Sequence, residues 1–408
     1  MANNGKYLML DKSETESSLE DVKRLLQAGS FDVAEEHLLE MQKDFPNHES
    51  VLYMLAVSQR YLKKYSAALN TLDQLKLLVP DHGRAYQETG HVYKATNDLD
   101  AALNAYSIAV TINSSLESSF RAQVEILRTT GRGNMTTRLE EQITFLRTLP
   151  KPLLMVVDLI AQGKLIKAEQ LCKAFMIKNP RHVEGMRLLA EIGSKLNVLD
   201  DAEFLLESAL ELAPGNLKAH IDYIQVLRRR QKHEIALKEA KLLFERHPRN
   251  IQCQSVFAIQ SLQSANYEQA LELFDSILSV VPNDPVTLTS RAHALKTLGK
   301  TEDAIESYRR AITKYPAHGE AYYSLANLKL FRFTDSEIFA METESSKDGV
   351  SHMNKVYLNF ALGKAYEDKN FFEKSFMHYN QGNSFKLIQS RFNLDELSDE
   401  FRAQEKVF

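Results

Sequence analysis

The chain has 408 residues, of which 44% are apolar, and it contains only 15 glycines and 10 prolines. Lys plus Arg number 50 and Asp plus Glu number 54, and no long block carries one sign of charge. This balance excludes the broad cationic surface that binding to nucleic acid or an anionic membrane would need. Because Leu, Ala, Glu, Lys and Gln dominate, the composition favours helix over strand along almost the whole chain.

The N-terminal sequence MANNGKYLMLDKSETESS has no cationic region followed by an apolar run. No window approaches the roughly 18 apolar residues that a membrane-spanning helix requires. We therefore expect residues 1–14 to form a tail, no membrane insertion, and a cytoplasmic location. Cys172 and Cys253 have no metal-binding spacing and are predicted to be packing residues.

Prolines give the first sign of internal repetition. Pro46 and Pro80 are 34 residues apart, and five further prolines follow one another at the same interval, namely Pro180, Pro214, Pro248, Pro282 and Pro316. Proline ends a helix because it has no N–H and clashes with the preceding turn. A fixed period of 34 in a helical composition resembles the tetratricopeptide repeat, in which each unit is a pair of helices.

Small residues recur in the same register. Positions are counted from the first residue of each unit, for example from residue 83 in the unit 83–116. Position 20 is alanine in eight units, where the two helices of such a repeat would approach too closely for a larger side chain. The alanines are Ala34, Ala68, Ala102, Ala168, Ala202, Ala236, Ala270 and Ala304. The sequence therefore predicts an all-α fold, a right-handed superhelical solenoid of antiparallel helix pairs.

The period predicts about nine units over residues 15–318, with two departures. The unit near 117–148 is distorted, because the interval from Ser114 to Pro180 is 66 residues instead of 68 and GRGN supplies a flexible break. After Pro316 no further proline follows the period. We expect a degenerate repeat and a polar linker over 319–352, with a first helix at 319–333 that has lost its partner and a mobile METESSKDGVSH segment at 341–352.

The C-terminal stretch resumes helical pairing. Residues 353–390 are predicted to form a divergent repeat, because Leu362, Gly363, Tyr366 and Tyr379 fall at repeat-like positions. Residues 391–408 have helical periodicity and are expected to lead toward a domain that this sequence lacks.

No motif for catalysis or for phosphate binding is present. The sequence contains neither of the glycine-rich loops that hold nucleotide phosphates, and no H-E-x-x-H metal motif. The chain is therefore predicted to have no catalytic, cofactor-binding or metal-binding residues. Solenoids of this kind bind extended peptides along the concave face formed by their first helices. Residues predicted to contact a peptide in that groove are Arg84, His91, Gln225, His293, Tyr323 and Asn327.

The sequence LANLKLFRF (325–333), followed by FALGKAYED (360–368) and HYNQGN (378–383), resembles the junction region of bacterial tetratricopeptide-repeat sulfotransferases. That resemblance implies an α/β sulfotransferase domain using 3′-phosphoadenosine-5′-phosphosulfate (PAPS), which a PRSGTT-type loop holds. No such loop occurs in the 408 residues. We therefore expect PAPS only if that domain were present, and regard the chain as a truncated repeat module of a bacterial protein.

Two functions remain open at this point. The chain could be the module that presents a polypeptide substrate to a sulfotransferase domain, or a stand-alone adaptor for a protein complex unrelated to sulfation. An enzyme with an unrecognised site among the helices is a third, weaker alternative.

Overall fold

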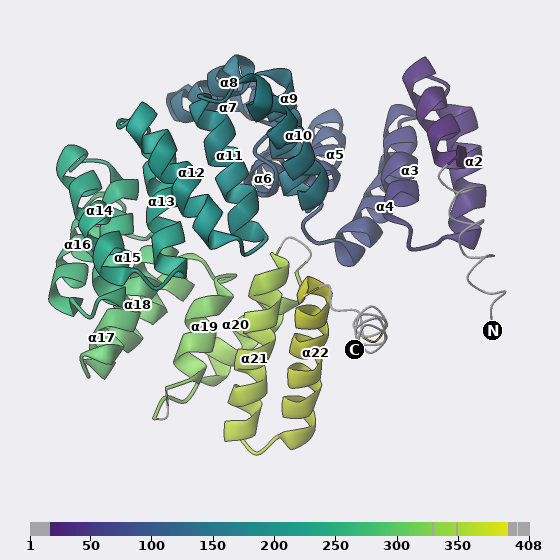
Figure 1. The fold of residues 1–408 in the computed structure, drawn as a ribbon. Helices are drawn as coiled ribbons and strands as arrows, with labels where there is room; N and C mark the ends of the chain where they lie inside the picture. Colours follow the sequence, from purple (N-terminus) through teal and green to yellow (C-terminus); the bar gives the residue numbers. More distant parts are fainter. Residues whose placement is uncertain (1–16, 329, 348–349, 391–397, 399–408) are drawn as a thin grey trace. The chain divides into compact units, whose positions relative to one another are not determined.

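The computed structural model describes residues 17–328, 330–347, 350–390 and 398, and within them all regular secondary structure is helical. The predicted all-α fold of paired helices is confirmed (Figure 1). The predicted tail at 1–14 lies outside the described residues, and so does the segment at 391–408 except for residue 398.

The chain divides into two compact halves, residues 1–198 and 199–408. In the N-terminal half, a helix that includes residues 17–28 precedes a regular series of helices. These are α2 (Phe31–Asp44), α3 (Glu49–Tyr61), α4 (Tyr65–Leu78), α5 (Gly83–Ala95), α6 (Leu99–Ile112), α7 (Glu117–Thr129), the short 3₁₀ turn η1 (Gly133–Met135), α8 (Thr137–Thr148), α9 (Lys151–Ala161), α10 (Leu165–Lys178) and α11 (Val183–Lys195).

The C-terminal half continues the series and then changes it. Its helices are α12 (Leu199–Leu212), α13 (Leu217–Arg229), α14 (His233–Arg246), α15 (Ile251–Gln263), α16 (Tyr267–Val280), α17 (Pro285–Thr297), α18 (Thr301–Lys314), α19 (Gly319–Ala326), α20 (Asp335–Ser345), α21 (His352–Asp368) and α22 (Phe372–Ser390). The last two helices are longer than the rest.

Close packing explains the recurring alanine. All eight alanines at position 20 have no exposed surface. At the facing position of the first helix, a Cβ added to Gly90 would lie 2.6 Å from the ring of Tyr106, so only a glycine leaves room for that ring. The repeat is therefore set by steric fit between the two helices of each pair.

The turn between the two helices of each regular pair contains one residue in the left-handed backbone region. Glycine and asparagine adopt this conformation at least cost, which explains their frequency here. The residues with positive φ are Gly29, Lys63, Asn97, Gly131, Gly163, Asn197, Gln231, Ala265, Gly299 and Asn370. Successive members are 34 residues apart, except for an interval of 32 between Gly131 and Gly163 and one of 71 between Gly299 and Asn370.

The long interval marks the irregular unit, and the structure corrects two predictions there. The first helix ends at Ala326, not at residue 333. The predicted polar linker at 341–352 begins inside α20, where Met341 is fully buried. Thr334 caps α20 by accepting from the backbone N–H of Glu337, whose carboxylate accepts from the backbone N–H of Thr334. This capping box fixes the start of α20 four residues after Phe331.

Helix α19 has also changed its packing partner. In the regular units the two helices of a pair pack together, whereas α19 packs mainly against α21, the first helix of the next pair, and α20 packs on α21 as well. Gly319 permits the approach, because a Cβ there would lie 2.5 Å from the backbone oxygen of Asn354. The side-chain oxygen of Asn354 accepts a hydrogen bond from the Gly319 N–H at 3.2 Å.

The last pair, α21 and α22, repeats the steric fit seen upstream. A Cβ on Gly363 would lie 2.7 Å from the ring of Tyr379, as for Gly90 and Tyr106. Gly363 follows Ala326, the corresponding residue of the previous unit, by 37 residues. The irregular unit is thus three residues longer than the period.

Candidate interaction surface

Both histidines predicted to line the groove are bonded within their own repeat. The Nδ1 atom of His91 lies 2.7 Å from the hydroxyl of Tyr106, and that of His293 lies 3.1 Å from the hydroxyl of Tyr308. Burial lowers the pKa of His91 to about 4, and the nearby charges of Arg60 and Lys94 act in the same direction. His91 is therefore a neutral side chain that ties the two helices of its pair together.

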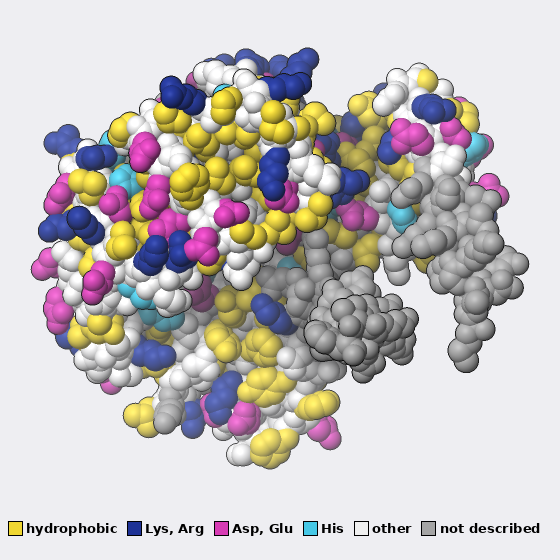
Figure 2. Space-filling view, viewed as in Figure 1, with side chains coloured by type: hydrophobic (Ala, Val, Ile, Leu, Met, Phe, Trp, Pro, Cys, Tyr) yellow, Lys and Arg dark blue, Asp and Glu magenta, His cyan; other side chains and the backbone are white. Residues whose placement is uncertain are grey.

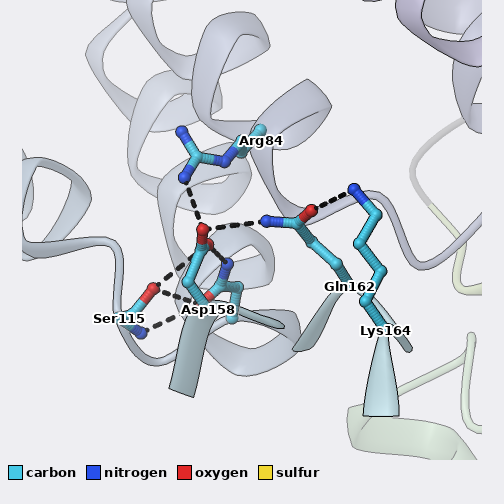
Figure 3. Close-up of polar contacts among 6 residues, drawn as sticks. Arg84, Ser115, Asp158, Gln162 and Lys164 are labelled. Carbon is cyan, nitrogen blue, oxygen red and sulfur yellow. Dashed lines mark hydrogen bonds and ion pairs between the residues drawn. The ribbon is translucent and has the colours of Figure 1, made fainter. Parts of the chain in front are cut away.

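Arg84 is engaged by a carboxylate from a helix that lies beyond the next repeat. Its guanidinium donates to Asp158 on α9 at 2.8 Å. The other oxygen of Asp158 accepts from the amide of Asn113 at 2.7 Å, and Gln162 donates to the carboxylate at 2.8 Å. Figure 3 shows Arg84, Ser115 and Gln162 directed toward Asp158, while Lys164 reaches Gln162.

This Asp158 cluster joins α5 and the α6–α7 turn to α9, across the distorted unit formed by α7 and α8. Asn113 is nearly fully buried, and its side-chain oxygen also accepts from the backbone and hydroxyl of Ser115. The two oxygens of the Asp158 carboxylate therefore accept from different elements, one from Arg84 on α5 and the other from the α6–α7 turn. Arg84 is therefore held in an internal contact, while its side chain stays 42% exposed.

The other predicted contacts are in the C-terminal half. Gln225 on α13 is exposed. Asn327 follows α19 directly and donates its side-chain amide to the carbonyl of Tyr323 at 3.0 Å, so it helps to end that helix. Tyr323 is 37% exposed and, among the predicted contact residues, it is the one that lies within a group of several aromatic side chains.

The ring of Tyr323 belongs to a continuous row of four aromatic side chains, here called the aromatic strip. Its centroid lies 5.4 Å from that of Tyr357 and 6.2 Å from that of Phe360, both on α21. The ring of Phe360 lies 6.5 Å from that of Tyr379 on α22. Except for the exposed Tyr323, the rings of the strip are half-buried.

Two carboxylates flank the aromatic strip. Glu320, one turn before Tyr323, lies 3.8 Å from Nε2 of His293, and hydrogen bonding to His293 holds the pKa of Glu320 below its usual value. At the other end, Glu367 accepts from the Tyr379 hydroxyl at 3.0 Å. Burial raises the pKa of Tyr357, and the negative charge of Glu320 raises it further. One carboxylate therefore lies at each end of the strip, Glu320 beside His293 and Glu367 beside Lys364.

Sequence reasoning found Tyr323 but missed Tyr357 and Phe360. Counting in steps of 34 from the regular units misplaces both, because the irregular unit holds three extra residues. The signal that could have found them is Gly363: when it is aligned with Gly90, Tyr357 and Phe360 fall at positions 2 and 5, which line the inner face. Asp158 had no comparable signal in the sequence.

Hydrophobic side chains are also visible at the surface over α21 and α22, with acidic and basic side chains between them (Figure 2). In the basic run at 228–233, Arg230 and Lys232 both pair with the buried carboxylate of Glu203. Within the described residues, no cluster of three or more His, Cys, Asp or Glu side chains could hold a metal ion. The same residues include no helix with the length and apolar character needed to cross a membrane.

Residues 50–82 and 289–328 match family models of the tetratricopeptide repeat. The chain contains tetratricopeptide repeats. A curated relative, the TPR repeat-containing thioredoxin TTL4 of Arabidopsis thaliana, is 34% identical over 68 residues, which span 17% of this chain and 10% of that protein. The family matches end at residue 328, so they cover regular repeats and leave α20 to α22 aside.

Several solved structures are similar to the chain at low identity. The APC/C hetero-tetramer Cut9-Hcn1 has 13% identity and a TM-score of 0.44, covering 90% of this chain and 86% of that one. A tetratricopeptide repeat protein from Parabacteroides merdae has 16% identity and a TM-score of 0.42, covering 69% and 98%. MamA from Desulfovibrio magneticus has 12% identity and a TM-score of 0.37, covering 40% and 92%.

Proposed function

We propose that this chain is a protein-interaction scaffold that binds an extended polypeptide at the aromatic strip on α19, α21 and α22. Tetratricopeptide repeats are a scaffold fold, and protein partners are their usual ligands. The observation that carries the proposal is the strip itself, in which four rings touch in series while Tyr323 stays 37% exposed. Aromatic side chains supply large contact areas at low entropic cost, which suits a binding surface.

A selection of peptides tests this proposal. A phage-displayed library of random nine-residue peptides is selected against the whole chain, and each enriched peptide is competed with the Tyr323→Ser variant. We expect peptides that bind the wild-type chain and bind the variant at least about fivefold more weakly, since interface aromatic residues often contribute more than about 1 kcal/mol. Failure to enrich any peptide, or equal binding to the variant, would contradict the proposal.

We further propose that the bound polypeptide is presented to a sulfotransferase domain. Support comes from the junction sequences at 325–333, 360–368 and 378–383, which build the irregular end of the solenoid: Phe331, Phe333 and Tyr366 are buried there. The chain has no PRSGTT-type loop for PAPS, so no step of sulfate transfer is assigned to its residues. The alternative, an adaptor unrelated to sulfation, shares the same binding surface.

Two simple observations test the scaffold assignment and separate these alternatives, respectively. Incubation of the chain with PAPS and a tyrosine-containing peptide should give no sulfated product, and turnover would overturn the scaffold assignment. The coding sequence downstream of residue 408 should encode a PRSGTT-like segment if the chain is a sulfotransferase module. Its absence would favour the adaptor.

A cytoplasmic location is part of the same proposal. Cys172 and Cys253 are both buried free thiols, as is usual in a reducing compartment, and burial raises the pKa of each. Cell fractionation should recover the protein in the cytoplasmic fraction.

A further inference from the structure

We propose that the aromatic strip and its flanking carboxylates form a subsite for a cationic side chain, arginine or lysine, of the bound polypeptide. The cation would lie against the ring faces, with a neighbouring apolar residue of the same polypeptide beside it. This inference rests on the proposed function, and it adds the chemical class of residue that the surface selects.

The strip exists because of the irregular unit. Helix α19 ends at Ala326 and packs against α21, so Tyr323 reaches Tyr357 and Phe360 on the neighbouring helix. The corresponding residues of the preceding units, Ser255 and Thr289, have no ring. The three extra residues and the glycine at 319 thus create a surface that the regular repeats do not have.

Among the described residues, no basic side chain is found over the ring faces of the strip. In the part of the chain that the structure describes, the basic side chains found over aromatic rings lie over Tyr61, Tyr86, Phe331 and Tyr366. Lys364, four residues after Phe360, bonds the carboxylates of Glu367 and Asp368 at 3.3 and 2.9 Å. An incoming cation would therefore meet rings with no cation already over them.

The charges around the strip favour a cation over an anion. Glu320 is ionised at neutral pH, since hydrogen bonding to His293 lowers its pKa, and its side chain is 45% exposed. Glu367 is 46% exposed at the opposite end. A cation over an aromatic face gains about 0.5–2 kcal/mol, and a nearby carboxylate adds to this attraction. An acidic or phosphorylated peptide would be repelled by the same carboxylates.

The test uses four fluorescein-labelled peptide pools of nine residues, identical except that the central residue is Arg, Lys, Gln or Glu. Binding of each pool to the full chain is measured by fluorescence anisotropy. We expect the Arg and Lys pools to bind about fivefold more tightly than the Gln pool, and the Glu pool to bind most weakly. The Tyr323→Ser variant should lose most of this preference, although its net charge is unchanged.

Matched variants distinguish the contribution of the Tyr323 ring to binding from that of the Glu320 charge and from nonspecific effects of a substitution. Tyr323→Phe keeps the ring and should keep the preference, whereas Glu320→Gln should reduce it. Tyr315→Ser removes a tyrosine that is 51% exposed outside the strip and should leave binding unchanged.

The outcomes distinguish this inference from the function on which it rests. If all four pools bind equally, or if Tyr323→Ser keeps the Arg preference, the cation subsite is wrong and the scaffold stands. If no pool binds at all, both the scaffold assignment and the subsite fail.

Discussion

The inner helices of the two halves use equivalent positions in opposite ways. In residues 1–198, Arg84 at position 2 of its repeat is held by Asp158 from a helix beyond the next repeat. In residues 199–408, Tyr357 at the same position and Tyr323 at position 5 remain at a surface of touching rings. Equivalent repeat positions can therefore differ in their partners: Arg84 bonds a carboxylate of its own half, whereas Tyr323 and Tyr357 lie among aromatic rings.

Each half has one irregular unit. The unit in the N-terminal half is shorter than the 34-residue period, and the unit in the C-terminal half is longer. The N-terminal one is two residues short and lets α9 reach α5, whereas the C-terminal one is three residues long and places α19 on α21. The first is accompanied by a polar cluster around Asp158, and the second by the aromatic strip.

The largest expected effect comes from abolishing the approach of α19 to α21. Gly319→Ala places a Cβ 2.5 Å from the backbone oxygen of Asn354, which cannot move as a flexible side chain would. We expect a loss of about 2–3 kcal/mol of stability in the C-terminal half. Urea unfolding and hydrogen exchange at α19 and α21 measure this effect. Gly215→Ala is the control, since nothing lies within 4 Å of its added Cβ.

Removal of the Asp158 carboxylate should destabilise the N-terminal half. Asp158→Ala leaves Arg84 and the buried amide of Asn113 without their acceptor, at a cost of about 1–3 kcal/mol. Faster hydrogen exchange at α9 and α5 should accompany the lower urea midpoint, while α19 and α21 should be unaffected. Asp158→Asn, which keeps one acceptor oxygen, should cost less than Asp158→Ala. Unchanged exchange at α9 would show that the cluster does not hold the two helices together.

A smaller effect is expected from pH. The pKa of His91 is about 4 in the folded protein because the ring is buried, against about 6.5 when unfolded. The unfolded state therefore binds more protons between these values, so stability from this group is complete above pH 6.5 and falls as the pH drops toward 4. His91→Gln should flatten the fall over this range. An identical slope in the variant would mean that other buried histidines, such as His82 and His318, account for it.

Much of the fold could be predicted because the repeat is steric. An alanine at position 20 and a proline after most second helices are local requirements, so the period reveals them without knowledge of the structure. The partner of α19 could not be predicted, since it depends on where the helix ends and on the absence of a Cβ at Gly319. Similarly, Asp158 is one of many carboxylates in the sequence, and only the packing of α9 brings it to Arg84.

The most direct test of the contrast between the two halves is hydrogen exchange of the whole chain with and without a peptide from the Arg pool. We predict slower exchange at α19 and α21 in the complex and no change at α5 and α9. Protection at α5 and α9, with none at α19 and α21, would contradict the assignment of the aromatic strip as the binding surface.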